Sequence, residues 1–128
     1  MSRWILDASA LLVMLHREPG SSMVEDALAE DAAIAAVNLS EVVAKLSDAG
    51  VPEPAIREAL SAMPLTVVPF DEDLAYRAGL LRRLTRAAGL SLGDRACIAL
   101  AQRTGAPVLT ADRAWATLSL PAAVRIVR

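Results

Sequence analysis

Residue types that carry common enzyme chemistry are nearly missing from this chain. Its 128 residues include one cysteine, Cys97, and one histidine, His16. A single cysteine makes no internal disulfide, which fits a reducing cytosolic compartment, and Cys97 lies on an apolar helical stripe where we expect it to pack in the core. A single histidine leaves little material for Ser-His or Cys-His catalysis. These absences argue against a catalytic triad and against a disulfide scaffold.

Long apolar runs are absent as well. Hydrophobic residues make up 55% of the chain, which argues against disorder, yet no run reaches membrane-spanning length. The first residues show no charged-then-apolar signal pattern. A length of 128 residues suits one domain with one core. Because no repeat, low-complexity tract or linker divides the chain, we expect a single domain over residues 1–128.

Lysine is scarce, since Lys45 is the only one and the other twelve basic residues are arginines. The formal net charge of −2 hides an asymmetry, because residues 1–64 have a net charge of −6 and residues 65–128 a net charge of +4. The global charge does not indicate nucleic-acid binding, but a local basic face would. The residues that we expect to form such a face on one helix are Arg82, Arg83 and Arg86. A solvated helix face explains these arginines equally well.

Alternating short apolar runs and helical patterns predict an α/β fold. Runs bounded by turn residues indicate buried strands at residues 3–6, 32–36, 65–69, 107–109 and 124–127. Apolar residues at helical spacing predict helices at residues 8–16, 21–29, 38–49, 53–63, 71–88 and 91–104, with a helical turn at 114–118. Ser21 is expected to cap the second of these helices. Because strands and helices alternate, we expect a parallel sheet covered on both faces.

Four carboxylates lie near the predicted starts of helices. Asp7 and Asp112 each follow a strand, and Glu41 and Asp94 fall in the first turn of a helix. In a parallel sheet these positions share one edge, where open α/β sheets bind ligands, so all four side chains can meet there. Helix capping is the alternative explanation for each, since Asp and Glu are favoured at helix starts.

Capping explains Glu41 better than Asp94. Asn38 and Glu41 have the spacing of a capping box. Asp94 lies three residues before Cys97 and four before Ile98, so it shares their apolar face, where a carboxylate is costly without a cationic partner. Carboxylates that converge do not all stay ionised without a counter-charge. Oxygen ligands favour Mg²⁺ or Mn²⁺ over zinc, and such ions suit phosphate chemistry.

Four segments carry a family resemblance, and they are Leu6–Ser9, Asn38–Val43, Leu92–Ala96 and Leu109–Trp115. Together, in this order and at these spacings, they resemble the motif blocks of the PIN-domain family, and most of all its VapC-type bacterial toxin branch. The resemblance spans nearly the whole chain. It implies a three-layer α/β/α fold with a parallel sheet of strand order 3-2-1-4-5 and an Mg²⁺- or Mn²⁺-dependent endoribonuclease. It also implies an RNA substrate, a cognate antitoxin and a homodimer.

The resemblance implies, by position, an acidic metal-binding and catalytic quartet with a hydroxyl in support. Its members here are Asp7, Glu41, Asp94 and Asp112, supported by Thr110. Some family members carry one more acidic residue just after the fourth, and residues 113–116 provide none. Three alternatives stay open: a PIN nuclease that processes RNA without a toxin role, a non-catalytic module whose acids only cap helices, and a receiver domain. A receiver pocket needs a lysine after a late strand, a position that Lys45 does not fill.

Overall fold

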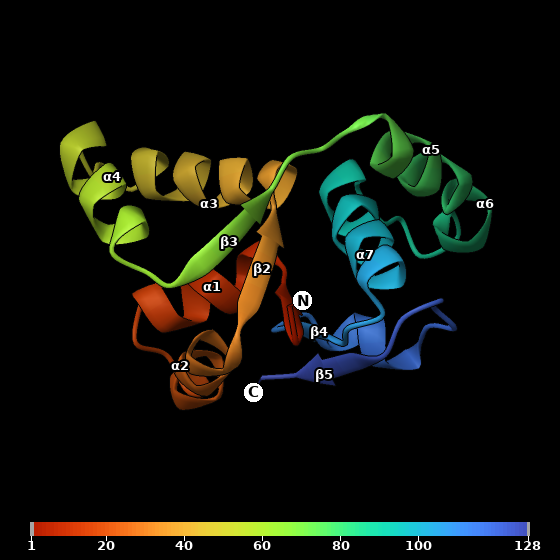
Figure 1. Cartoon of the computed structure of the whole chain (residues 1–128), viewed down its shortest axis with the longest axis horizontal. Coiled ribbons are helices and arrows are strands. Elements are labelled where there is room, and N and C mark those ends of the chain that lie inside the picture. The colour runs from red at the N-terminus through yellow and green to blue at the C-terminus, as the bar shows by residue number, and fades with distance from the viewer. Residues whose placement is uncertain (1, 128) are drawn as a thin grey trace.

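The computed structural model describes residues 2–127, and strands alternate with helices along them (Figure 1). The strands are β1 (Trp4–Leu6), β2 (Ala32–Ala35), β3 (Leu65–Val68), β4 (Val108–Thr110) and β5 (Val124–Ile126). The helices are α1 (Ala8–Leu15), α2 (Ser21–Glu30), α3 (Ala36–Asp48), α4 (Glu53–Ser61), α5 (Glu72–Leu80), α6 (Arg82–Thr85) and α7 (Leu92–Thr104), and a 3₁₀ turn, η1, covers Arg113–Thr117.

All strand pairs in the five-stranded sheet are parallel, and the strand order β3-β2-β1-β4-β5 confirms the expectation. From the central β1 the chain runs to β2 and β3 and then crosses to β4 on the other side. Such a reversal opens a crevice at the carboxyl ends of the two central strands, here β1 and β4. The order also differs from the 2-1-3-4-5 order of flavodoxin-like receiver folds, which removes that alternative.

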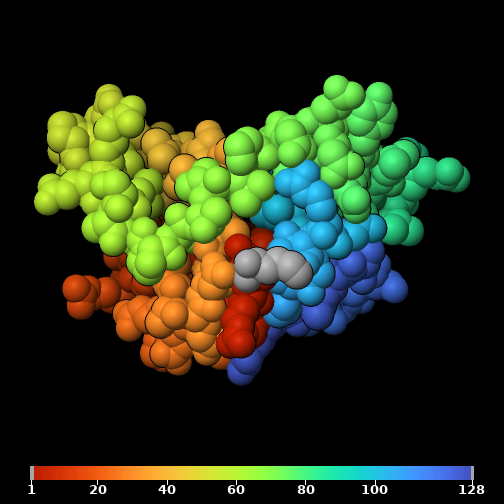
Figure 2. Space-filling view, viewed as in Figure 1, coloured from red at the N-terminus to blue at the C-terminus, as the bar shows by residue number. Residues whose placement is uncertain are grey.

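Helices cover both faces of the sheet, which confirms the three-layer prediction. Helices α1 to α4 pack on one face and α5 to α7 on the other (Figure 1). Successive strand residues point to opposite faces, so Leu6 and Leu109 join the apolar cluster under α1 to α4, whereas Ile5 and Val108 join the one under α5 to α7. The expected single core is therefore two apolar clusters separated by the sheet. Figure 2 shows the two helical blocks standing apart, with a saddle between them.

The predicted helix over residues 71–88 is wrong as one element, because it divides into α5 and α6. The buried hydroxyl of Thr85 donates to the Leu81 carbonyl at 2.9 Å, and the Thr85 amide donates to the same oxygen at 3.1 Å. A hydroxyl bonded back to the preceding turn often bends a helix. Gly89, at φ +69°, then turns the chain toward α7.

The predicted cap at Ser21 is also wrong. Gly20 is the N-cap of α2, with φ +99° and no side-chain capping bond, and Ser21 is the first helical residue. A Cβ at Gly20 would collide with the carbonyl of Val127. The close approach of the last strand segment and the left-handed backbone both require glycine here.

Residues 2–127 contain no helix with the length and apolar character needed to cross a membrane.

Candidate active site

Asp7 is held from two neighbouring elements at the carboxyl end of β1. The Ala10 amide and the Ser9 hydroxyl donate to its Oδ1 at 2.9 Å and 2.7 Å. The Thr110 hydroxyl donates to Oδ2 at 2.6 Å. Asp7 is only 5% exposed. It therefore caps α1, as expected, and both of its oxygens are fixed in direction.

Burial, with a smaller contribution from the negative charge of Asp94, raises the pKa of the Asp7 carboxyl to about 6. Hydrogen bonds from Thr110, Ala10 and Ser9 oppose that shift. None of the ion pairs found among residues 2–127 involves Asp7, so no basic side chain of that part of the chain neutralises it. A desolvated carboxylate beside a second carboxylate is the electrostatic situation that a bound cation relieves.

Two hydroxyls join the end of β1 to the end of β4. Thr110 is fully buried, and its Oγ1 accepts from the Asp112 amide at 3.0 Å. Ser9 Oγ lies 3.2 Å from that hydroxyl and accepts from the Ala111 amide at 2.9 Å. The predicted support from Thr110 thus has a geometric basis. Sequence reasoning missed Ser9, although its position two residues after Asp7, at the start of a helix, is the signal that would have found it.

Asp94 completes the capping box of its helix, whose N-cap is Ser91, and lies within electrostatic range of Asp7. Its Oδ2 accepts from the Ser91 amide at 2.9 Å, and its own amide donates to Ser91 Oγ at 3.2 Å, which is a complete capping box. The side chain is half-buried, and its charge acts on Asp7. Capping and membership of an acidic cluster are therefore compatible at this residue.

Glu41 is not part of a capping box, so that prediction is wrong. Helix α3 begins at Ala36, which places Asn38 inside its first turn and Glu41 in its second. Instead of capping, the buried Asn38 amide donates to Glu41 Oε1 and to the Gly93 carbonyl, both at 2.9 Å. The Glu41 side chain consequently leans toward the first turn of α7.

The buried thiol of Cys97 shows which carboxylates share one neighbourhood. Burial raises its pKa well above the usual value, and the charges of Asp7, Asp94 and Glu41 add to the shift. Cys97 is fully buried, which confirms its place in the core. Three of the four predicted acidic residues therefore lie within electrostatic range of one point below the carboxyl edge of the sheet.

Asp112 follows β4 as expected, but its side chain turns to its own helix. It is exposed, and its Oδ1 accepts from the Ala114 amide at 3.0 Å, so it caps η1. Within residues 2–127 no three His, Cys, Asp or Glu side chains stand close enough to hold a metal ion. The donor types match Mg²⁺ or Mn²⁺, and the carboxylates approach one another without forming a closed ligand set.

Three predicted basic residues lie on the outside of the α5–α7 block. Arg82 and Arg83 belong to α6 and Arg86 is its C-cap, and all three are exposed. Arg83 and Arg86 line a shallow depression of about 320 Å³. An exposed basic surface of this kind is suited to contacts with a phosphate backbone, and simple solvation explains it equally well.

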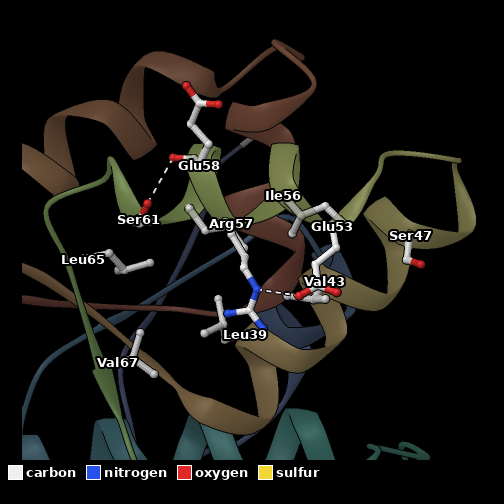
Figure 3. Close-up of a pocket in the computed structure, with 11 residues that line it drawn as sticks. Leu39, Val43, Ser47, Glu53, Ile56, Arg57, Glu58, Ser61, Leu65 and Val67 are labelled. Carbon is white, nitrogen blue, oxygen red and sulfur yellow. Dashed lines mark hydrogen bonds and ion pairs between the residues drawn. The ribbon is translucent and has the colours of Figure 1, made fainter.

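A hollow of about 720 Å³ lies between α3, α4 and β3, and none of the four predicted acidic residues lines it. In Figure 3, Leu39 and Val43 from α3, Ile56 from α4 and Leu65 and Val67 from β3 line it, and a pair between Arg57 and Glu53 at 2.7 Å crosses its rim. Its mostly apolar wall holds no candidate catalytic group.

The family follows from a direct match. The PIN domain model matches residues 4–119, which include all four acidic residues and nearly the whole sheet. The chain belongs to the PIN domain family. Among curated proteins, none is similar to this PIN domain in sequence.

Solved structures share the PIN fold of this chain over nearly their full length. A toxin–antitoxin complex from Klebsiella pneumoniae is similar with a TM-score of 0.76, 21% identity and 97% of each chain covered. A DNA-bound VapBC from Salmonella typhimurium gives 0.78, 16% identity and full coverage of both chains. A VapC toxin of Mycobacterium tuberculosis described as cleaving the sarcin–ricin loop gives 0.70 and 14%, with 91% of this chain and 96% of that chain covered. At these identities the likeness concerns the fold.

Proposed function

We propose that this PIN domain is a divalent-metal-dependent endoribonuclease that hydrolyses RNA phosphodiester bonds as the toxin of a toxin–antitoxin pair. The observation that carries the proposal is Asp7, a buried carboxylate with a raised pKa beside Asp94 and without a basic partner among residues 2–127. It stands at the switch point between β1 and β4, where α/β sheets bind ligands.

The chemistry of the donor set fits Mg²⁺ or Mn²⁺. Asp7, Asp94 and Asp112 would hold the ion directly or through water, and Glu41 would hold a second ion or orient a water. A bound ion of this kind polarises a phosphate and lowers the pKa of a coordinated water. The protein itself fixes Asp7 through Ser9 and Thr110, and its capping box fixes Asp94. These hydrogen bonds hold two carboxylates in place against their mutual repulsion.

RNA is the proposed substrate, and the basic face of Arg82, Arg83 and Arg86 is its proposed backbone contact. The three side chains are exposed and lie on the chain segment that leads into α7, whose first turn carries Asp94. Phosphate contacts of this type position a nucleic acid without reading its sequence. The likeness in fold to a sarcin–ricin-loop-cleaving toxin supports an RNA substrate.

A cognate antitoxin and a second copy of the chain are the proposed protein partners. The fold is shared with chains of toxin–antitoxin complexes, which supports this assignment. A basic antitoxin side chain that pairs with Asp7 and Asp94 would silence the site through charge-assisted hydrogen bonds. Finding a small open reading frame next to the gene for this chain would support the toxin role. Finding none would support the alternative, a PIN nuclease that processes RNA without a toxin role.

A non-catalytic module is the second candidate, because Asp7, Asp94 and Asp112 each accept a hydrogen bond from a helix-start amide. Capping alone explains those contacts. It does not explain why Asp7 is buried beside another charge, since an exposed cap would serve a helix as well at lower cost.

Cleavage of RNA by the purified protein separates these candidates. Wild type should cut RNA with Mg²⁺ or Mn²⁺ and not with a chelator. The cleavage rate of Asp94→Asn, whose side-chain oxygen can still accept from the Ser91 amide, should fall about 100-fold or more. Glu58→Gln, which removes an exposed acid on α4, is the matched control and should cut like wild type. A wild-type protein that cuts no RNA with either metal would overturn the proposal.

A further inference from the structure

Glu41 has a long side chain whose carboxylate is repelled by the nearby carboxylates of Asp7 and Asp94. Its carboxylate lies against Gly93, the residue before Asp94, and its charge reaches the same buried thiol as the charges of Asp7 and Asp94. Like charges at such a site push one another apart. A flexible glutamate would relieve that repulsion by swinging into solvent. Something in the fold must therefore hold it.

Asn38 donates the hydrogen bond that holds the Glu41 carboxylate in place. Its side chain is 1% exposed, and both hydrogens of its amide are used, one on Glu41 Oε1 and one on the Gly93 carbonyl. Because the hydrogen bond to Glu41 is charge-assisted, it is stronger than one between neutral groups. The second bond fixes the amide against α7, so Glu41 is positioned relative to the helix that carries Asp94.

Gly93 leaves space for the Glu41 carboxylate because it has no side chain. A Cβ built on Gly93 would come within 2.6 Å of Glu41 Cδ and still closer to a carboxylate oxygen. No side chain fits at this position while the carboxylate stays where it is. The backbone conformation of Gly93 is helical, so positive φ does not account for the glycine. The absence of a side chain at Gly93 leaves the space that the Glu41 carboxylate occupies.

The buried oxygen of Asn38 indicates that stability alone does not explain this arrangement. Oδ1 has no hydrogen-bond partner among residues 2–127. A buried acceptor without a partner is costly and is tolerated where the rest of the group does something that an apolar residue cannot. Here the rest of the group is the pair of donors that hold Glu41 and α7.

We propose that Asn38 and Gly93 are positioning residues that together hold the Glu41 carboxylate at the metal-binding edge of the sheet. The inference rests on the proposed function and extends it to two residues outside the acidic quartet. It makes Gly93 an informative position, because one added methyl group should displace a carboxylate that the mutation does not alter chemically.

Gly93→Ala tests the proposal, and Gly79→Ala is its matched control. Both place alanine inside a helix, where alanine is the better helix former, but a Cβ at Gly79 meets nothing within 4 Å. With Gly93→Ala we expect the Mn²⁺ concentration that gives half of the thermal shift to rise about 10- to 100-fold, and RNA cleavage to fall by a similar factor. Gly79→Ala should match wild type in both. Asn38→Asp, which exchanges the donors for a negative charge, should behave like Gly93→Ala.

A double mutant shows whether the effect travels through Glu41. Glu41→Ala empties the space beside Gly93, so adding Gly93→Ala to it should change neither the Mn²⁺ response nor cleavage further. Equal Mn²⁺ responses and cleavage rates for Gly93→Ala and Gly79→Ala would overturn the inference while leaving the proposed function standing. Full additivity with Glu41→Ala would also overturn it. A wild-type protein that shows neither a Mn²⁺ response nor cleavage would overturn the proposed function and this inference with it.

Discussion

At the scale of single residues, the surroundings of Asp7 both raise and lower the pKa of its carboxyl. Burial and the charge of Asp94 favour its protonated form, whereas hydrogen bonds from Thr110, Ala10 and Ser9 favour its ionised form. Burial prevails, and the pKa stands at about 6 against an ordinary 3.8. In the absence of metal, the folded protein therefore keeps a proton that the unfolded chain has already released at mildly acidic pH.

This difference predicts how the stability of the metal-free protein depends on pH. Because the raised pKa belongs to the folded state, the stability it contributes is present below pH 3.8 and is lost as the pH rises to about 6. A shift of this size corresponds to about 3 kcal/mol. In chelator, wild type should therefore lose about that much relative to Asp7→Asn between pH 4 and pH 7, measured by urea unfolding. Parallel stability curves for the two proteins would contradict this account of Asp7.

Sequence reasoning identified the acidic residues but not their surroundings. Composition and spacing pointed to Asp7 and Asp94 because carboxylates at strand ends and on apolar helix faces are visible in a sequence. The roles of Asn38 and Gly93 were not visible, since they depend on α3 and α7 meeting across the sheet edge. The Asn38–Glu41 spacing predicts a capping box, but residues three apart also share a face inside a helix, which is how the structure uses them.

At the scale of elements, the single helix predicted over residues 71–88 is divided into α5 and α6, but its residues are buried and exposed as expected. The apolar pattern Leu74, Ala78, Leu81 and Thr85 is buried throughout, as expected. This apolar pattern continues without interruption across the break between α5 and α6. Hydrophobic periodicity therefore does not reveal the break, which is accompanied by the hydrogen bond from the Thr85 hydroxyl. The three arginines remain on the outside, where they are free to meet a polyanion.

The arginine face makes a quantitative prediction about salt. If these side chains contact RNA phosphates, each single replacement by alanine should weaken binding regardless of RNA sequence and flatten the slope of log affinity against log salt by roughly 0.7 to 1. Fluorescence anisotropy with a non-cleavable RNA, using Asp94→Asn protein, measures both effects. Arg57→Ala, an exposed arginine on α4 across the sheet, is the control. Unchanged slopes for Arg82, Arg83 and Arg86 would assign this face to solvent or to a protein partner.

At the scale of the whole molecule, the strand order determines where the chemistry can occur. The crossing from β3 to β4 places the ends of β1 and β4 side by side, and Leu6 pairs with Leu109 just before Asp7 and Thr110. Strand pairing is non-local, so local patterns predicted the strands but not their order, which came from the family resemblance. The same topology brings α3 and α7 to one edge from opposite faces of the sheet (Figure 1).

In the proposed function, Asp94 belongs to a cation site and does more than complete a capping box. Thermal unfolding of wild type and Asp94→Asn, first in chelator and then in millimolar Mn²⁺, tests this claim most directly. In chelator, Asp94→Asn should melt at or above wild type, because the asparagine oxygen can still accept from the Ser91 amide and one repelling charge is gone. With Mn²⁺, wild type should gain stability by mass action, about 2.7 kcal/mol at 100 times the dissociation constant, and the variant much less. Equal Mn²⁺-induced shifts in the two proteins would contradict the claim.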